Sequence, residues 1–221
     1  MIKTHLSNFR IVLALFILVL GLMSYGLAQD LGSRDLARDE KNKDSQALEM
    51  ADLKNGMVVG EVGAGDGYFT FMLVDHVGPK GKVYANDIFD KRALEVIRNR
   101  AQEKNIKNII TILGTDENPK FPKGQLDMVF ICQAMHEFKN PVQMFCNIAP
   151  ALKPDGKLVI LDWEEINPSR TRNSHMYTRK DFHDWVNQSP FSVERIDDKS
   201  LPNNKSFMKV VYVLSLKQES K

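Results

Sequence analysis

The sequence has little of what marks several classes of protein. Its 221 residues include only two cysteines, Cys132 and Cys146, so disulfide bonds cannot be the main support of the fold. A chain of this length builds a sizeable hydrophobic core without them. The sequence leaves open whether the two thiols pair in an oxidising compartment or are small buried hydrophobic residues. It also has no internal repeat and no low-complexity tract, so one globular domain is expected.

An excess of basic residues is also lacking. The chain has 30 Lys and Arg against 28 Asp and Glu, and two of the basic residues, Lys3 and Arg10, are the only formal charges among the first 28 residues. The remainder therefore carries 28 charges of each sign. Proteins that bind nucleic acids neutralise phosphates with a positive surface. We therefore expect no nucleic-acid partner, and a small-molecule or lipid-like partner instead.

Long uncharged hydrophobic runs are absent except at the start. Residues 11–20 form such a run after a basic beginning, and no charge follows until Asp30. Together with the small residues Gly26 and Ala28, this order is typical of a signal peptide cleaved after Ala28. The alternative is an uncleaved anchor over 11–28, because about 20 helical residues span a bilayer. In either case the positive-inside rule places the domain on the non-cytoplasmic side, in the periplasm or outside the cell.

The rest of the chain divides into a polar lead-in and a globular part. We expect residues 1–28 to be the signal peptide or membrane anchor and to lie outside the fold. Residues 29–44 are dense in charge and poor in apolar periodicity, which predicts a polar linker. Residues 45–221 are the expected domain.

Within the domain, apolar runs alternate with amphipathic stretches, which is typical of βαβ units around a parallel sheet. The predicted fold class is α/β, Rossmann-like and doubly wound, with a mostly parallel seven-stranded sheet and a C-terminal antiparallel hairpin. The predicted strands are 57–62, 82–86, 108–113, 126–132, 157–161, 191–196 and 207–216. The predicted helices are 46–53, 68–76, one capped by Asp90, 141–152 after Asn140, and one that begins with a capping box at 178–181.

A glycine-rich turn follows the first predicted strand. Gly63, Gly65 and Gly67 allow the backbone to approach a ligand closely, and the next helix offers unpaired N–H groups. Asp87 ends the second predicted strand, 24 residues after Gly63, where a carboxylate accepts hydrogen bonds from ribose hydroxyls. The pair predicts a nucleoside site and does not choose between NAD and S-adenosylmethionine. Glu61 favours the latter, because a carboxylate there suits an amino group and repels a pyrophosphate.

Four motifs in order resemble class I S-adenosylmethionine-dependent methyltransferases over roughly residues 46–216. They are VGEVGAGDG at 59–67, VYANDI at 83–88, LGTDE at 113–117 and LKPDGKLVILD at 152–162. The segments YFT at 68–70 and GKVYA at 81–85 further resemble the small-molecule branch of this family, a subset of which is exported.

The resemblance implies S-adenosylmethionine as the cofactor and a role for each matching position. It implies that Glu61 and the backbone of Gly63, Ala64 and Gly65 hold the methionine end, that Asp87 binds the ribose, and that Ile88 lies on the adenine. Family members often have Gly-Asp after the third strand. Here Thr115 follows the glycine and the acid comes one residue later, so Thr115 or Asp116 is expected to contact the adenine amino group.

The resemblance also implies that the segment after the fourth strand faces the transferred methyl group. His136 and Glu137 are therefore the candidate catalytic residues. His136 either acts as a base or only orders its loop, because methyl transfer depends chiefly on in-line positioning. The segment HEFKN at 136–140 lacks the second histidine of a zinc-binding helix, so no metal is predicted.

The expected function is transfer of a methyl group from S-adenosylmethionine to a small or lipid-like acceptor that the sequence does not identify. A non-catalytic module that binds this cofactor is the alternative, because the cofactor is made in the cytoplasm and the domain is expected beyond the membrane. An NAD-dependent oxidoreductase is the third reading, against which Glu61 and the turn at 152–156 both argue.

Overall fold

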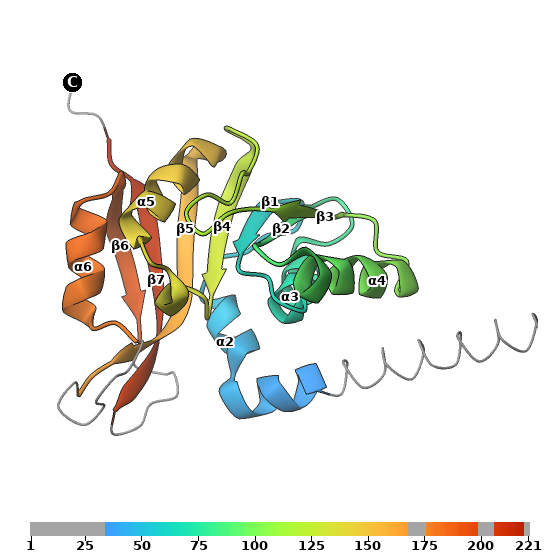
Figure 1. Ribbon diagram of the computed structural model, residues 1–221, viewed down its shortest axis with the longest axis horizontal. Helices are drawn as coiled ribbons and strands as arrows, with labels where there is room; N and C mark the ends of the chain where they lie inside the picture. Colours follow the sequence, from blue (N-terminus) through green and yellow to red (C-terminus); the bar gives the residue numbers. More distant parts are fainter. Residues whose placement is uncertain (1–33, 168–175, 199–205, 219–221) are drawn as a thin grey trace, which may run out of the picture. The chain divides into compact units, whose positions relative to one another are not determined.

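The computed structural model describes residues 34–167, 176–198 and 206–218 (Figure 1). The chain divides into two units, residues 1–41 and a compact unit from Asn42 to Lys221. Residues 34–42 are helical, within the stretch expected as a polar linker, and the compact unit begins at Asn42 rather than at residue 45.

The compact unit is built on one seven-stranded sheet in the order β3-β2-β1-β4-β5-β7-β6. Strands β1 to β5 are parallel, and β7 pairs antiparallel with both β5 and β6. The mostly parallel, Rossmann-like sheet and its C-terminal hairpin confirm the predicted fold class. The strands are β1 (Val58–Val62), β2 (Lys82–Asp87), β3 (Ile109–Leu113), β4 (Leu126–Cys132), β5 (Leu152–Glu165), β6 (Phe191–Asp197) and β7 (Phe207–Leu216).

Helices and short helical turns connect the strands. They are α2 (Asp44–Glu49), α3 (Tyr68–Val77), a π-helical turn η1 (Asp90–Leu94) that continues into α4 (Glu95–Glu103), η2 (Met135–Glu137), α5 (Pro141–Ile148), η3 (Ala149–Ala151) and α6 (Arg179–Asn187). Two predicted helix starts are confirmed. The Asn140 side chain accepts a hydrogen bond from the Gln143 N–H ahead of Pro141, and Thr178 and Asp181 form the capping box.

The prediction that Asp90 caps a helix is wrong. Asp90 is itself the first residue of η1, and the preceding Phe89 makes no side-chain cap. The Phe89 N–H instead donates to Oδ1 of Asp87 at 2.9 Å, while Asp90 pairs with Arg98. Asp90 thus lies inside the helical turn, where its carboxylate pairs with the Arg98 side chain instead of capping the first backbone N–H groups.

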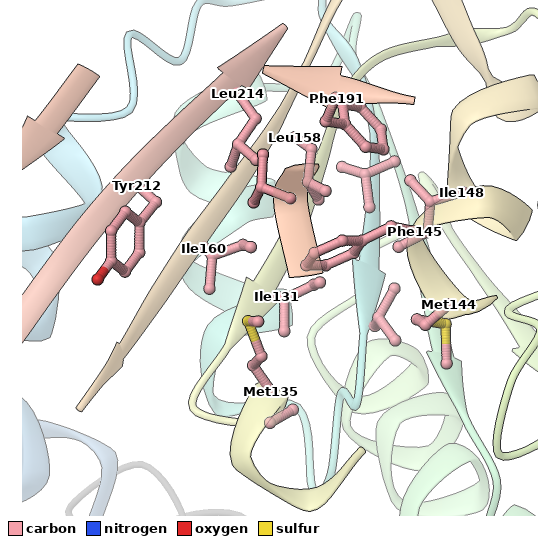
Figure 2. Packing of buried hydrophobic residues seen from close by; sticks show 14 of the residues in the cluster. Ile131, Met135, Met144, Phe145, Ile148, Leu158, Ile160, Phe191, Tyr212 and Leu214 are labelled. Atoms are coloured by element: carbon pink, nitrogen blue, oxygen red, sulfur yellow. The ribbon is translucent and has the colours of Figure 1, made fainter. Parts of the chain in front are cut away.

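Each face of the sheet buries its own hydrophobic cluster. One cluster lies under α5 and α6, where Phe145 and Phe191 meet edge to face with ring centroids 6.1 Å apart (Figure 2). Tyr177 and Phe182 belong to this cluster, and the Phe182 and Tyr212 rings stack with their centroids 3.6 Å apart. The other cluster joins α2 and α3 to the opposite face. Burial of each large side chain contributes about 1.5–3 kcal/mol, so the two clusters supply most of the driving force for folding.

Strand β5 is longer than the predicted 157–161, because it pairs with β7 as far as Glu165. The prediction stopped where the apolar run stops. Asp162, Glu164 and Glu165 continue the strand as buried carboxylates, and a hydrophobic pattern does not reveal such residues. The predicted helix 141–152 is shorter, since α5 ends at Ile148 and η3 follows.

The predicted N-terminal signal or anchor lies outside the described residues. Among the residues that are described, no helix has the length and apolar character needed to cross a bilayer. Cys132 is buried in β4 and Cys146 is half-buried in α5, and neither forms a disulfide bond.

Candidate functional site

The glycine turn between β1 and α3 is fixed to the end of β2 by backbone hydrogen bonds. The N–H groups of Gly63 and Ala64 both donate to the Asn86 carbonyl at 2.9 Å. Gly63, Gly65 and Gly67 all have positive φ, at 75°, 56° and 92°, which only glycine adopts at little cost. A Cβ on Gly63 would lie 2.6 Å from that of Ala134, whereas a Cβ on Gly65 would meet nothing within 4 Å.

Asp87 ties this turn to the carboxyl end of β2. Its Oδ2 accepts a hydrogen bond from the Gly65 N–H at 2.9 Å, and its Oδ1 accepts one from the Phe89 N–H. The carboxylate is 8% exposed, so it is held in one place with little contact with solvent. A carboxylate oxygen has two lone pairs, and each oxygen of Asp87 therefore keeps capacity for a ligand hydroxyl.

A cleft of about 510 Å³ opens beside this turn at the carboxyl ends of β1, β2 and β4. The order of strands reverses between β1 and β4, and ligands of doubly wound sheets bind at such a switch point. The cleft is lined by Val62, Gly63, Gly65, Asn86, Asp87, Ile88, Phe89, Thr115, Asp116, Gln133, Ala134, Glu137, Phe138, Lys139 and Met144.

Most of the predicted site residues share this cleft, and three do not line it. Its walls include Gly63, Gly65, Asp87, Ile88, Thr115, Asp116 and Glu137. Ile88 is 43% exposed at the wall, which leaves its side chain free to lie against a flat ring. Glu61, Ala64 and His136 are not among the lining residues.

Glu61 is buried at 1% exposure in β1 and accepts a hydrogen bond from the Thr70 hydroxyl of α3. Burial raises its pKa to about 8, and the nearby carboxylates of Asp87 and Asp66 add to the rise, while the Thr70 bond opposes it. Near neutral pH the free protein therefore holds this carboxyl largely protonated. A ligand ammonium group would have to displace that proton to pair with Glu61.

Thr115 and Asp116, the two candidates for contact with the adenine amino group, both line the cleft. Thr115 accepts a hydrogen bond at Oγ1 from the Asn118 N–H, and Asp116 lies 3.5 Å from Nζ of Lys139. Asn86 supports the loop that carries them, because its Nδ2 donates to the carbonyls of Ile112 and Pro119. Both Thr115 and Asp116 are thus available to a ligand.

His136 is held by a residue that the sequence analysis did not single out. Its Nδ1 lies 3.0 Å and 3.1 Å from the two carboxylate oxygens of Asp162, which is fully buried at the end of the predicted fifth strand. Asp162 also accepts hydrogen bonds from the N–H groups of Met135 and Trp163. The hydrogen bond to Asp162 raises the pKa of His136. His136 Nε2 lies 3.5 Å from the exposed Glu137 carboxylate.

Gln133 is the second residue that the sequence analysis missed. It lines the cleft directly after β4 and has a φ of 51°, which is uncommon for a residue other than glycine. Its side-chain Nε2 donates to Oδ1 of Asp44 at 2.9 Å. No local signal could have shown this contact, because the partner lies 89 residues earlier in the chain.

The described part of the chain contains no group of three or more His, Cys, Asp and Glu side chains that could hold a metal ion. The residues of the cleft instead suit a nucleoside. They offer a carboxylate for ribose hydroxyls, an apolar wall with polar groups at its edge, and a glycine turn that admits close approach of a ligand.

Comparisons with known proteins agree with this geometry. A family model described as a methyltransferase domain matches residues 53–209. A protein-L-isoaspartate O-methyltransferase from Pyrococcus horikoshii is 33% identical over 51% of this chain and 47% of its own length. A demethylmenaquinone methyltransferase from Lactococcus lactis is 32% identical over 51% of this chain and 44% of its own length. The chain thus spans about half the length of these curated relatives.

Solved structures share the fold. A SAM-dependent methyltransferase from Aquifex aeolicus superposes with a TM-score of 0.67 at 23% identity, over 80% of this chain and 92% of its own. A geranyl diphosphate C-methyltransferase from Streptomyces coelicolor, in complex with S-adenosyl-L-homocysteine, superposes with a TM-score of 0.64 at 16% identity, over 79% and 76%. The match over residues 53–209 confirms the resemblance to class I S-adenosylmethionine-dependent methyltransferases, and the chain belongs to the methyltransferase domain family.

Proposed function

We propose that this protein transfers a methyl group from S-adenosylmethionine to a small or lipid-like acceptor. The observation that carries the proposal is the Asp87 carboxylate, fixed at the switch point by the glycine turn and facing the cleft. Enzymes that methylate many different acceptors share this fold and family. The fold and family therefore indicate the cofactor but do not identify the acceptor.

Each part of the cleft has a role toward the cofactor. Asp87 would accept the ribose hydroxyls, Ile88 would lie on the adenine, and Thr115 or Asp116 would receive the adenine amino group. The turn at Gly63 to Gly65 would hold the methionine end. Glu61 is buried in β1, just before that turn. Its partner would be the ammonium group of the methionine end.

When bound, the cofactor supplies an electrophilic methyl group attached to a positive sulfur. The chain's own contribution is to position the acceptor and to manage its proton. His136 is suited to the second task, because Asp162 holds its Nδ1 and its Nε2 faces the exposed Glu137 carboxylate, which an acceptor with an ionisable proton would displace. Above its raised pKa the imidazole is neutral at Nε2 and can take that proton.

The nature of the acceptor is supported by the names of relatives. Demethylmenaquinone and geranyl diphosphate, for which two of the similar enzymes are named, are small organic molecules, whereas the relative from Pyrococcus horikoshii is named for protein L-isoaspartate. The charge balance of the chain also speaks for a partner other than a nucleic acid. Both observations favour a small or lipid-like acceptor.

The proposed location is beyond the membrane, either exported or anchored, and it rests on the apolar run at 11–20 and its basic flank. A mass spectrum of the mature N-terminus from separated membrane and soluble fractions tests it. Cleavage after Ala28 in the soluble fraction supports export. A full-length chain in the membrane supports the anchor, and a full-length chain in the soluble cytoplasmic fraction contradicts both.

Isothermal titration of the purified protein with S-adenosylmethionine and S-adenosylhomocysteine tests the proposed function. Binding of both, followed by release of S-adenosylhomocysteine when candidate acceptors are added, supports an enzyme. If the protein binds the cofactor but transfers no methyl group to any component of the native membrane or soluble extract, the result supports the non-catalytic alternative. Absence of binding to both ligands by folded protein contradicts the proposal.

A further inference from the structure

A buried carboxylate from the N-terminal part of the compact unit connects three elements of the fold. Asp44 is fully buried and accepts hydrogen bonds from Tyr68 Oη at 3.0 Å and Gln133 Nε2 at 2.9 Å, and it pairs with the Lys209 ammonium group. Lys209 is also fully buried and donates to the Asn42 carbonyl at 2.7 Å. The donors come from the start of α3, the segment after β4, and β7.

One of these donors lines the cofactor cleft, and another begins the helix that follows the glycine turn. Tyr68 is the first residue of α3 and follows Gly67, so its hydroxyl fixes the helix that leaves the glycine turn. Gln133 itself lines the cleft. Asp44 does not line it and therefore acts on the cleft only through these neighbours.

The ion pair by itself is weak grounds for a role in stability. Removing two charges from water costs about as much as their attraction returns, and apolar replacements of buried pairs are often neutral or stabilising. The contribution of the Asp44 carboxylate is instead to orient Gln133. Gln133 has a left-handed backbone, which costs about 1–2 kcal/mol outside glycine, and its N–H donates to the Leu161 carbonyl at 2.7 Å. A conformation of this kind persists only where surrounding contacts hold it.

We propose that Asp44 is a positioning residue of the cofactor cleft, which holds Gln133 and the start of α3 in the geometry that binds the cofactor. The proposal rests on the proposed cofactor function. It places part of the binding site's support before residue 53, where the matched family segment begins. The N-terminal part of the compact unit thus contributes to cofactor affinity without touching the ligand.

The test uses the full-length protein and S-adenosylhomocysteine as the probe. Asp44→Leu combined with Lys209→Met removes both charges and leaves apolar groups of similar size. This double variant should bind the probe about tenfold more weakly, because it removes the acceptor of the Tyr68 and Gln133 hydrogen bonds. Adding Gln133→Leu should cause no further loss, because Asp44 acts through Gln133. Glu49→Gln, on the exposed end of α2, is the matched control and should bind like the wild type.

Amide hydrogen exchange of the ligand-free protein gives a second readout. The Gln133 amide should exchange faster in the double variant than in the wild type, at an unchanged melting temperature. Tyr68→Phe removes only one hydroxyl. This variant replaces the double variant in the test if the double variant does not fold. It should weaken binding about threefold, a smaller loss than in the double variant, because the Gln133 hydrogen bond to Asp44 remains.

Wild-type affinity and wild-type exchange at Gln133 in the folded variants would overturn the proposal, as would affinity losses that multiply when Gln133→Leu is added. A wild-type protein that binds neither cofactor nor S-adenosylhomocysteine would instead overturn the cofactor assignment. In that case the exchange rate of the Gln133 amide still tests whether Asp44 positions Gln133.

Discussion

Nδ1 of His136 lies 3.0 Å from Oδ1 of Asp162, and the same carboxylate accepts hydrogen bonds from the backbone N–H groups of Met135 and Trp163. Asp162 therefore orients both the imidazole and the loop that carries it. In this position His136 either orders its loop or acts as a base at Nε2, which lies 3.5 Å from the exposed Glu137 carboxylate. The titration of His136 separates these two roles.

His136 should titrate above 6.5, because the hydrogen bond to Asp162 stabilises its charged form. Asp162→Asn should lower that pKa towards its ordinary value, as measured by NMR of the ring protons. The rise in kcat/KM with pH should move in the same direction. A pH profile that Asp162→Asn leaves in place would contradict a base role for His136.

His136→Asn should lower kcat about 10²–10⁴-fold if the imidazole takes the acceptor's proton, with little change in affinity for S-adenosylhomocysteine. His183→Asn, on α6, is the matched control and should retain wild-type turnover. If both variants turn over at wild-type rate, His136 has only an ordering role.

Asp87→Asn should weaken binding of S-adenosylhomocysteine roughly tenfold or more, because charged hydrogen bonds to the ribose are worth about 1.5–3 kcal/mol each. Titration calorimetry measures the change. Asp75→Asn, on the exposed side of α3, provides the comparison and should bind normally. Equal affinities for the two variants would remove Asp87 from the ribose site.

Gly65→Ala and Gly124→Ala form a matched pair. Both glycines have positive φ, at 56° and 64°, and a Cβ on either meets nothing within 4 Å. Each substitution should lower the free energy of unfolding by about 1–2 kcal/mol through backbone strain. Only Gly65→Ala places a methyl group beside the cleft, so only this variant should lose affinity for the cofactor. Chemical denaturation and calorimetry on both variants test this.

Glu61 predicts a pH-dependent stability. Its pKa is raised from 4.5 to about 8 in the folded state, so the folded state retains a proton that the unfolded state releases between these values. The free energy of unfolding should therefore fall as pH rises from 4.5 to 8, by at most about 5 kcal/mol from this group. Urea denaturation should show that Glu61→Gln lacks this part of the decline. Parallel pH curves for wild type and variant would contradict it.

Much of the fold followed from the sequence because its signals are local. The alternation of apolar runs with amphipathic stretches, the glycines at positive φ and the caps at Asn140 and Thr178 each act within a few residues. The same holds for the cleft, since the ends of parallel strands meet at one edge of a sheet. Gly63, Gly65, Asp87 and Ile88 therefore meet where the order of predicted strands brings them.

Most predictions that failed depended on contacts between segments far apart in the sequence. Asp90 is a local exception, because the helical turn begins at the residue that was expected to cap it and its carboxylate pairs with Arg98. Strand β5 runs on through Asp162 and Glu164, which are buried with donors from distant segments, the Met135 N–H and the Tyr212 hydroxyl. Hydrophobic periodicity carries no information about such carboxylates.

The sequence alone determined the fold class, the family and the ligand-facing turn, because backbone conformation and hydrophobic pattern are encoded over short distances. Only the tertiary structure decided which residues support the site. Asp162 meets His136 across 26 residues and Asp44 meets Gln133 across 89. A buried carboxylate is stable only where donors converge on it, and that convergence exists only once the sheet has brought those segments together.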